Sequence, residues 1–486
     1  MSSCPVVIGV DVATAAVRAL CADGRGRVHG EAREPLPPPV RGPGGTSEQD
    51  ARAWWPAVEA ALRRITDGLP AHGREVVAVA VSATSGTIVP TGAGGRLLGP
   101  ALMYDDRRAA GTNAEAQRLG AARWDALGLA VGPTAALGRA VGCLHTHGPA
   151  LRRVLHTPEV IGRALTGGSV PADWSHALKT GYDPRSGQWA EEVFAALGFP
   201  VALLPDVGAP GTEAGTVGRA AAAATGLPVG CSVRLGMTDG CAGQLATGAV
   251  APGQFVGVLG TTYVLKGVTT TLVRDPAGAL YSHRHPDGWW LPGGASNTGG
   301  EALAPLPAPR IAALDRAARK RGPASYLRYP LRREGERFPF VAPGARGFAL
   351  GAPEDGADAH RAALEGVAFL ERLAVERVRS LGVPVSGPLF AAGGGSRSPV
   401  WNAIRATVLD RPVQVAERAE TAFGAALLAA SGTLHTSLAA CAAAMTGGPG
   451  AASAVTEPVP AERAALEDAY GRFVAELGRR GWLDGA

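Results

Sequence analysis

The sequence predicts an α/β protein with at least two domains, and three observations support this prediction. The chain has 486 residues, which is more than one hydrophobic core usually holds. Short apolar runs, such as 6–10 and 389–392, alternate with longer segments of helical periodicity, such as 360–381. In addition, an apolar strand followed by a small residue and a threonine occurs twice, about half a chain apart.

The repeated segments are 8–14, which reads Ile-Gly-Val-Asp-Val-Ala-Thr, and 255–261, which reads Phe-Val-Gly-Val-Leu-Gly-Thr. In the first copy, a second apolar strand follows over 16–21 and completes a hairpin. Small residues at a hairpin turn allow a phosphate group to approach the backbone closely. We therefore expect a duplicated domain with one phosphate-binding hairpin in each half.

The composition is that of a folded protein, because 46% of the residues are hydrophobic and 18% are charged. The net charge of +5 is spread along the chain without a basic block, so no nucleic-acid partner is expected. The six cysteines form no CxxC pair, which favours free buried thiols over a zinc site. Without a signal-peptide pattern or a transmembrane apolar run, the sequence predicts a cytoplasmic protein with no membrane partner.

The first half then predicts a helix over 50–65, with Trp54 and Trp55 in the core, and a buried strand over 76–81. The strand leads into the hydroxyl-rich turn 82–87, Ser-Ala-Thr-Ser-Gly-Thr. Such a turn can hydrogen-bond a polyol, although an ordinary polar turn has the same composition. The charged segment 104–108 that follows is either a solvated face or a further set of sugar contacts.

Three histidines lie in the helical and loop-rich segment 111–170, namely His145, His147 and His156. They have no carboxylate at metal-ligand spacing, so we expect surface residues and no metal site there.

A second group of polar residues lies near the middle of the chain. Asp239 follows the apolar alternation of Val233 and Leu235 and precedes a short helical run over 241–247. A carboxylate there would lie at the edge of a sheet, where α/β folds place their ligands. Gly260, Thr261 and Thr262 can hold a phosphate with backbone N–H groups and hydroxyls. The combination suggests phosphoryl transfer, whereas two ordinary turns and an N-capping aspartate are the alternative.

In the second half, the strand 389–392 runs into Gly393-Gly394-Gly395 and then into a helix over 399–409. Glycines between a strand and a helix allow a nucleotide to touch the backbone. The pattern is neither GxGxxG nor a P-loop, which argues against a Rossmann dehydrogenase and a Walker ATPase.

Taken together and in this order, these motifs resemble the FGGY family of carbohydrate kinases within the actin-like ATPase superfamily. The resemblance covers the two hairpins, the Asp239 segment, the three glycines and the late helical segment 420–426. Within the family, the segments 281–283, 293–300 and 335–339 look most like the D-ribulose kinase branch, which is related to xylulokinases.

The resemblance implies an α/β fold with two actin-like (ribonuclease H-like) domains and a cleft between them. The N-terminal domain, 1–248, would bind the sugar, and the C-terminal domain, 249–486, would bind the nucleotide. The implied reaction transfers the γ-phosphate of ATP, with Mg²⁺, to a hydroxyl of a ketopentose, D-ribulose in preference to D-xylulose. A small-molecule sugar is the implied partner, and a homodimer is the expected assembly.

The resemblance also implies roles for residues that match the family's motifs. Asp239 corresponds to the catalytic base, which also contacts the sugar, and Asp11 corresponds to the residue near the metal. Thr84 and Ser85 match the sugar-contacting turn. The phosphate and nucleotide loops correspond to Thr14, Gly260, Thr261, Thr262, Gly394 and Gly395.

The first hairpin departs from the family pattern at two positions. Ala13 replaces a glycine and Ala15 replaces a hydroxyl residue, and Tyr104 stands where the family has tryptophan. If position 13 required a positive φ, alanine would cost about 1 kcal/mol or more. A nucleotide or sugar sensor with weakened catalysis is therefore the alternative function, ahead of an actin- or chaperone-like ATPase.

Overall fold

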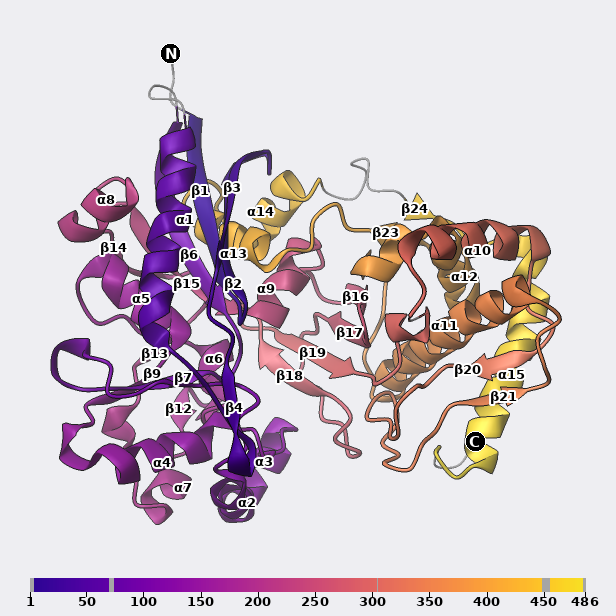
Figure 1. The fold of residues 1–486 in the computed structure, drawn as a ribbon, viewed down its shortest axis with the longest axis horizontal. Helices are drawn as coiled ribbons and strands as arrows, with labels where there is room; N and C mark the ends of the chain where they lie inside the picture. The colour runs from indigo at the N-terminus through magenta and orange to yellow at the C-terminus, as the bar shows by residue number, and fades with distance from the viewer. Residues whose placement is uncertain (1–3, 70–73, 304, 448–454, 484–486) are drawn as a thin grey trace. The chain divides into compact units, whose positions relative to one another are not determined.

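The computed structural model describes residues 4–69, 74–303, 305–447 and 455–483. Contacts divide the chain into two compact units (Figure 1). Unit 1 comprises Met1–Val250, His283–Gly288 and Arg418–Ala451, and unit 2 comprises Ala251–Ser282, Trp289–Glu417 and Ala452–Ala486. Each unit contains a mixed β-sheet and helices, so the predicted α/β class with two domains is confirmed. The boundary between 248 and 249 concerns the two sequence domains of the family and stays a prediction.

The main sheet of unit 1 has the strand order β14-β15-β6-β1-β2-β3. β1, β2 and β3 form an antiparallel meander, and β6 and β15 run parallel to β1. β1 is buried on both faces, which explains its nearly continuous apolar sequence. The strands are β1 (Cys4–Val12), β2 (Ala16–Asp23), β3 (Val28–Pro35), β6 (Arg74–Ala83), β14 (Glu213–Thr216) and β15 (Ser232–Thr238).

Two helices cover opposite faces of this sheet. α1 (Trp54–Gly68) packs against β2 and β3, in one hydrophobic cluster with Val6, Ile8 and Val10. α13 (Thr421–Ala430) packs against β1 and β6 on the other face of the sheet. Strand residues point alternately to the two faces, so β1 contributes buried residues to both. Trp54 is buried and Trp55 is half-buried against the α1 cluster, which confirms them as core residues.

The rest of unit 1 surrounds this sheet with helices and a second, smaller sheet of order β4-β5-β8-β7-β9. Its strands are β4 (Val40–Gly42), β5 (Thr46–Gln49), β7 (Ile88–Thr91), β8 (Ala101–Leu102) and β9 (Arg153–His156). The short pairs are β10 (Ala172–Asp173) with β13 (Val207–Gly208) and β11 (Tyr182–Asp183) with β12 (Gln188–Trp189). The helices are α2 (Ala110–Leu119), α3 (Ala121–Leu127), α4 (Ala136–His147), α5 (Thr157–Thr166), α6 (Trp174–Leu178), α7 (Glu191–Ala196), α8 (Arg219–Thr225), α9 (Asp239–Ala246) and α14 (Leu438–Met445).

One prediction for this region is wrong. His145 is exposed and His147 is half-buried, but His156 is only 1% exposed. Its Nδ1 lies 2.8 Å from a carboxylate oxygen of Glu159, and its Nε2 lies 2.9 Å from the Thr180 hydroxyl. Both ring nitrogens therefore have polar partners, which allows a histidine to be buried.

The second large sheet belongs to unit 2 except for His283 and Arg284 of β18, which are counted with unit 1. Its order is β18-β19-β17-β16-β22-β23-β24, where β17 is antiparallel to β16, and β22 is parallel to β16. Its helices include α11, which contributes a long buried face. The strands are β16 (Phe255–Leu259), β17 (Tyr263–Gly267), β18 (Tyr281–Arg284), β19 (Trp290–Ala295), β22 (Leu389–Ala392), β23 (Val413–Val415) and β24 (Val455–Thr456), besides the pair β20 (Leu327–Tyr329) and β21 (Phe348–Leu350). The helices are α10 (Ala308–Arg321), α11 (Gly356–Ser380), α12 (Pro399–Leu409) and α15 (Arg463–Arg479).

The two sheets share one topology. The series β3-β2-β1-β6-β15 of unit 1 corresponds strand for strand to β19-β17-β16-β22-β23 of unit 2. The β1–β2 hairpin thus has the same place as the β16–β17 hairpin, which confirms the duplication that the repeated segments predict. Within the described ranges, no helix is long and apolar enough to cross a bilayer.

Candidate active site

The first hairpin of unit 1 carries a buried carboxylate. Asp11, near the end of β1, is 4% exposed, and Arg18 is its cross-strand partner on β2. Nη1 of Arg18 lies 3.2 Å from Oδ2 of Asp11, whereas Oδ1 is buried and has no hydrogen-bond partner in the described part of the chain. Burial raises the pKa of Asp11 to about 6, the nearby Asp239 carboxylate adds to the rise, and Arg18 opposes it.

The turn of this hairpin is tight and unstrained. The backbone N of Ala13 donates to the carbonyl of Ala16 at 3.1 Å. Among the described non-glycine residues, only Asp410 has a positive φ, so Ala13 adopts an ordinary backbone conformation. The amide of Gln49 donates to the carbonyl of Thr14 at 2.8 Å and fixes the far side of the turn. Alanine at position 13 therefore costs no backbone strain.

The predicted sugar turn follows β6 directly. Thr84 and Ser85 are half-buried, and the hydroxyls of Ser85 and Thr87 are buried without a hydrogen-bond partner in the resolved ranges. A buried hydroxyl left without a partner costs about 1–3 kcal/mol. A cavity of about 10 Å³, lined in part by Thr14, Thr84 and Thr87, has room for one water. The two predicted motifs, the phosphate hairpin and the sugar turn, thus meet in unit 1.

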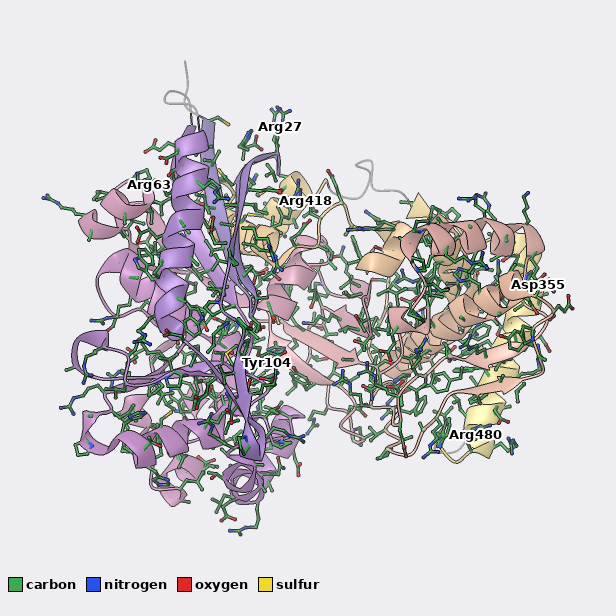
Figure 2. All side chains as sticks on the ribbon, viewed as in Figure 1. Arg27, Arg63, Tyr104, Asp355, Arg418 and Arg480 are labelled. Carbon is green, nitrogen blue, oxygen red and sulfur yellow. The ribbon has the colours of Figure 1, made fainter. Side chains whose placement is uncertain are left out.

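A buried arginine holds the sugar turn against a neighbouring loop. The guanidinium of Arg139, on α4, is 1% exposed and donates to the carbonyls of Gly86 at 2.8 Å and of Met103 at 2.6 Å. Burial lowers the pKa of Arg139 to about 10. The loop after Met103 presents Tyr104, whose side chain is 42% exposed (Figure 2). Arg139 therefore fixes the spacing between the hydroxyl turn and Tyr104.

The charged segment after Tyr104 is mainly structural. Asp106 is fully buried, accepts a hydrogen bond from the backbone N of Ser47 at 2.7 Å and pairs with Arg108. Asp105 pairs with Arg41 on the neighbouring strand β4. These contacts explain the two aspartates without a sugar, and Tyr104 is exposed together with Arg107 and Arg108.

Asp239 is the first residue of α9, directly after β15. It is half-buried, and its Oδ1 accepts from the backbone N of Gly240 at 2.7 Å rather than capping the helix. The pairing of β15 with β6 shifts register between Leu235 and Thr238. Gly236 lies within this shift, where a Cβ would come 2.1 Å from the carbonyl oxygen of Val81. Glycine therefore permits the irregular backbone directly before Asp239.

The second hairpin lies in unit 2 between β16 and β17. The backbone N of Gly260 donates to the carbonyl of Thr262 at 3.2 Å and closes the turn. The carbonyls of Gly260 and Thr261 accept from the backbone N–H groups of Gly300 and Glu301 at 2.8 and 3.0 Å. Thr261 is exposed and Thr262 is half-buried. Backbone hydrogen bonds from Gly300 and Glu301 thus fix the turn, and its two threonines are at least partly accessible.

The three glycines after β22 lie beside this second hairpin. Gly393 has a φ of 86°, and a Cβ there would lie 2.6 Å from the carbonyl oxygen of Leu259. A Cβ on Gly395 would lie 2.5 Å from Cδ2 of the Leu259 side chain. No described atom lies within 4 Å of the Cβ position on Gly394, so a ligand can reach the backbone there. Unit 2 therefore brings its predicted phosphate and nucleotide residues together.

The structure adds residues that the sequence does not single out. Arg18 could be found from the hairpin register, because it lies opposite Asp11. Gln49 and Arg139 act on backbone carbonyls distant in sequence, for which no sequence pattern exists. Among the described residues, no group of three or more His, Cys, Asp and Glu side chains forms a metal site.

Known proteins match the chain along most of its length. The model of the N-terminal domain of the FGGY family of carbohydrate kinases matches residues 6–246, and that of the C-terminal domain matches residues 246–433. A xylulose kinase of Streptomyces rubiginosus is 31% identical over 450 residues, 88% of each chain. An erythritol kinase of Brucella abortus is 27% identical over 466 residues, 87% of each chain. The crystal structure of xylulose kinase from Rhodospirillum rubrum superposes with a TM-score of 0.85 at 27% identity, covering 98% of each chain.

Proposed function

We propose a substrate class and residue roles for this chain, which belongs to the FGGY family of carbohydrate kinases and is an ATP-dependent sugar kinase. The proposed reaction transfers the γ-phosphate of ATP to a hydroxyl of a ketopentose. The observation that carries the proposal is the pair of carboxylates in unit 1, Asp11 and Asp239, with the buried hydroxyls of the sugar turn in the same unit.

Two ketopentoses are candidates. The relatives named xylulose kinase support D-xylulose, since they match the chain over most of their length. The segments 281–283, 293–300 and 335–339 resemble the D-ribulose kinase branch and favour D-ribulose. Both sugars have the same functional groups and differ in the configuration at one carbon, so the same turn of Thr84 and Ser85 could serve either.

The residues of unit 1 fit a divalent cation. Oδ1 of Asp11 is buried and has no partner within the described ranges, and a second carboxylate lies close enough to raise the pKa of Asp11. Carboxylate oxygens are the ligands that Mg²⁺ prefers in proteins. Bound Mg²⁺ would neutralise charge on the phosphate that is transferred. Asp11 is the proposed holder of this ion.

The chain's own groups perform the other tasks. Asp239 holds the attacking sugar hydroxyl in line and accepts its proton late in the transfer, a role worth about 10²–10⁴-fold in rate. Thr84 and Ser85 orient the sugar through their hydroxyls. In unit 2, the backbone N–H groups and hydroxyls at Gly260, Thr261 and Thr262 hold phosphate oxygens, and Gly394 and Gly395 admit the nucleotide. Thr14 contributes the corresponding contact of the first hairpin.

A coupled assay of ADP release over ketopentoses, ketohexoses, erythritol and glycerol tests the proposal. We expect ADP release to depend on a ketopentose and to be lost in Asp239→Ala. ADP release that is independent of every sugar would contradict the proposal. Calorimetric binding of sugar and ATP without turnover would favour the sensor alternative. Light scattering of the same sample tests the homodimer that is also proposed.

A further inference from the structure

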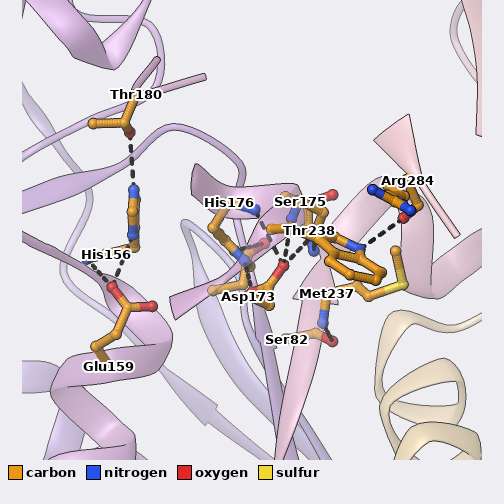
Figure 3. A network of polar contacts seen from close by, with 12 residues as sticks. Ser82, His156, Glu159, Asp173, Ser175, His176, Thr180, Met237, Thr238 and Arg284 are labelled. Carbon is orange, nitrogen blue, oxygen red and sulfur yellow. Dashed lines mark hydrogen bonds and ion pairs between the residues drawn. The ribbon is translucent and has the colours of Figure 1, made fainter. Parts of the chain in front are cut away.

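A buried polar network in unit 1 contacts the last residue of β6, directly before the sugar turn, and the last residue of β15, directly before the proposed base. Figure 3 shows its side chains. The network consists of Asp173, Ser175 and His176, at the start of α6. Each of these side chains is at most 1% exposed, and the proposed function gives none of them a role. Because burying charged groups seldom adds net stability, a buried ion pair of this kind needs another explanation.

Asp173 is the centre of the network. Its Oδ1 accepts from the backbone N of Ser175 at 2.9 Å and of His176 at 3.1 Å, which caps α6, and from the Ser175 hydroxyl at 2.5 Å. Its Oδ2 lies 2.5 Å from Nδ1 of His176. The carboxylate therefore fixes the orientation of both neighbouring side chains.

His176 connects this centre to the sugar turn. Its Nε2 lies 3.2 Å from the carbonyl oxygen of Ala83, the last residue of β6 before Thr84. A carbonyl and a carboxylate accept hydrogen bonds, so a ring protonated on both nitrogens satisfies both contacts. Burial alone would lower the pKa of His176, but the Asp173 carboxylate outweighs burial and the pKa is raised.

Ser175 connects the same centre to the strand that carries Asp239. Its hydroxyl oxygen accepts from the backbone N of Thr238 at 2.9 Å. The hydroxyl of Ser82 accepts from the preceding N–H, that of Met237, at 3.2 Å. Both contacts lie at the register shift between β15 and β6. Side-chain hydroxyls thus take the place of strand-to-strand hydrogen bonds directly before Asp239.

We infer that Asp173, Ser175 and His176 are positioning residues that set the sugar turn and the base relative to one another. His176 holds the sugar turn through the carbonyl of Ala83, and Ser175 holds the strand before the base through the N–H of Thr238. Asp173 binds both His176 and Ser175 and so connects the two contacts. The inference rests on the proposed ketopentose kinase function and deepens it. A small displacement of a reacting group can cost about 10²-fold in rate, so such a link has kinetic consequences.

A second buried histidine provides a matched control. The ring of His156 lies 6.0 Å from that of His176 and is equally buried. It contacts Glu159 and Thr180, however, and its side-chain hydrogen bonds within the described ranges reach neither the end of β6 nor that of β15. The charged groups that raise the pKa of His176 are Asp173 and, more weakly, Glu159. A histidine needed for stability alone would behave as His156 does.

The kinetic test compares His176→Gln, Ser175→Ala, Ser175→Thr and the control His156→Gln in the full chain. For His176→Gln we expect the KM for the ketopentose to rise about tenfold, with a smaller fall in kcat. For Ser175→Ala we expect kcat to fall about tenfold at nearly unchanged sugar KM, and Ser175→Thr should restore it. In His156→Gln both parameters, per folded enzyme, should stay within about twofold. Equal effects in His176→Gln and His156→Gln would overturn the inference.

A substrate-free measurement separates this inference from the proposed function. In ¹⁵N NMR spectra of the full chain, we expect His176→Gln to shift the amide signals of Ser85 and Asp239 together. Ser175→Ala should shift the Asp239 signal, and the control should shift neither. If both signals are unchanged in His176→Gln, the link does not exist, whatever the substrate is. If they move but no sugar is phosphorylated, the proposed function fails while the link remains.

Discussion

The two phosphate hairpins occupy the same position in sheets of the same strand order, yet their chemistry differs. The first, in unit 1, carries the buried Asp11 and its partner Arg18, and its turn contains Ala13 and no glycine. The second, in unit 2, carries Gly260, Thr261 and Thr262, and hydrogen bonds from the backbone N–H groups of the segment 300–301 fix its turn. The first hairpin thus presents a charged group, and the second presents neutral hydrogen-bond donors.

This difference changes how the departures at Ala13 and Ala15 are interpreted. A loop that binds phosphate through its backbone depends on glycine, whereas a strand end that presents a carboxylate does not. Ala13 has no positive φ and costs no strain. We therefore expect the first hairpin to act mainly through Asp11, and the second to bind phosphate. The following predictions, from the largest expected effect to the smallest, test this division.

Removing the proposed base should have the largest effect. In Asp239→Ala we expect kcat to fall about 10²–10⁴-fold, because the proton of the sugar hydroxyl loses its acceptor. The Kd for ATP, measured by calorimetry, should change by less than about threefold, because the nucleotide residues lie in unit 2. Full activity in this variant would contradict the role of Asp239 as the base.

Neutralising the charged hairpin should raise stability while lowering activity. The pKa of Asp11 is raised from 3.8 to about 6. Since the folded state holds the proton more tightly, wild-type stability falls as pH rises through this window. At pH 7.5, the free energy of unfolding of Asp11→Asn should therefore exceed that of the wild type by about 1–3 kcal/mol. This difference in stability should vanish below about pH 4, where the wild-type carboxyl is protonated in both states.

The same variant tests the cation without an activity assay. Mg²⁺ should raise the thermal midpoint of the wild type in calorimetry, because it binds the folded state, and should not raise that of Asp11→Asn. An equal rise in both proteins would place the ion elsewhere.

Removing hydroxyls from the neutral hairpin should have a smaller effect, confined to the nucleotide. In Thr261→Val and Thr262→Val we expect the KM for ATP to rise about 10–150-fold, since each loses one hydrogen bond to a charged oxygen, which is worth about 1.5–3 kcal/mol. The KM for the sugar should stay unchanged in steady-state assays. A rise in the sugar KM instead would contradict the division between the hairpins.

Restoring the family residue at position 13 should have the smallest effect. Ala13→Gly should lower the unfolding free energy by about 0.4–1 kcal/mol, because glycine adds entropy to the unfolded chain, and should leave kcat within about twofold. Gly393→Ala is the contrast, because it places a Cβ at positive φ against the Leu259 carbonyl. It should destabilise unit 2 more strongly in thermal denaturation. A large gain of activity in Ala13→Gly would show that the first hairpin also binds phosphate through its backbone.

Local signals in the sequence predict much of the fold. The helix Arg219–Thr225 ends at Gly226, whose φ of 75° caps it, and Pro399 begins the helix Pro399–Leu409. The strand Leu389–Ala392 is a plain apolar run. In contrast, β20 and β21 lie in a segment rich in prolines and arginines, where three-residue strands leave no periodicity to detect.

The candidate site is predictable where its residues follow strand ends. Asp11 and Asp239 can be identified in this way, and the structure shows that they influence each other. Arg139 is not predictable, because its partners are backbone carbonyls on other segments of the chain. For His156, the nearby Glu159 could be found from the spacing of three residues, but the distant Thr180 could not. A buried polar side chain in an otherwise helical segment looks like a surface residue until its partners are known.

The position of α13 has a consequence for the synthesis of the protein. This helix is buried from Ala422 to Ala430 and packs against β1, β6, β15 and α9, all of which leave the ribosome much earlier. A nascent chain that has just passed residue 250 contains every strand of the first sheet but not the helix that covers its second face. The earliest sheet to emerge is thus completed only when nearly the whole chain exists, so premature termination yields an aggregation-prone fragment rather than a working half.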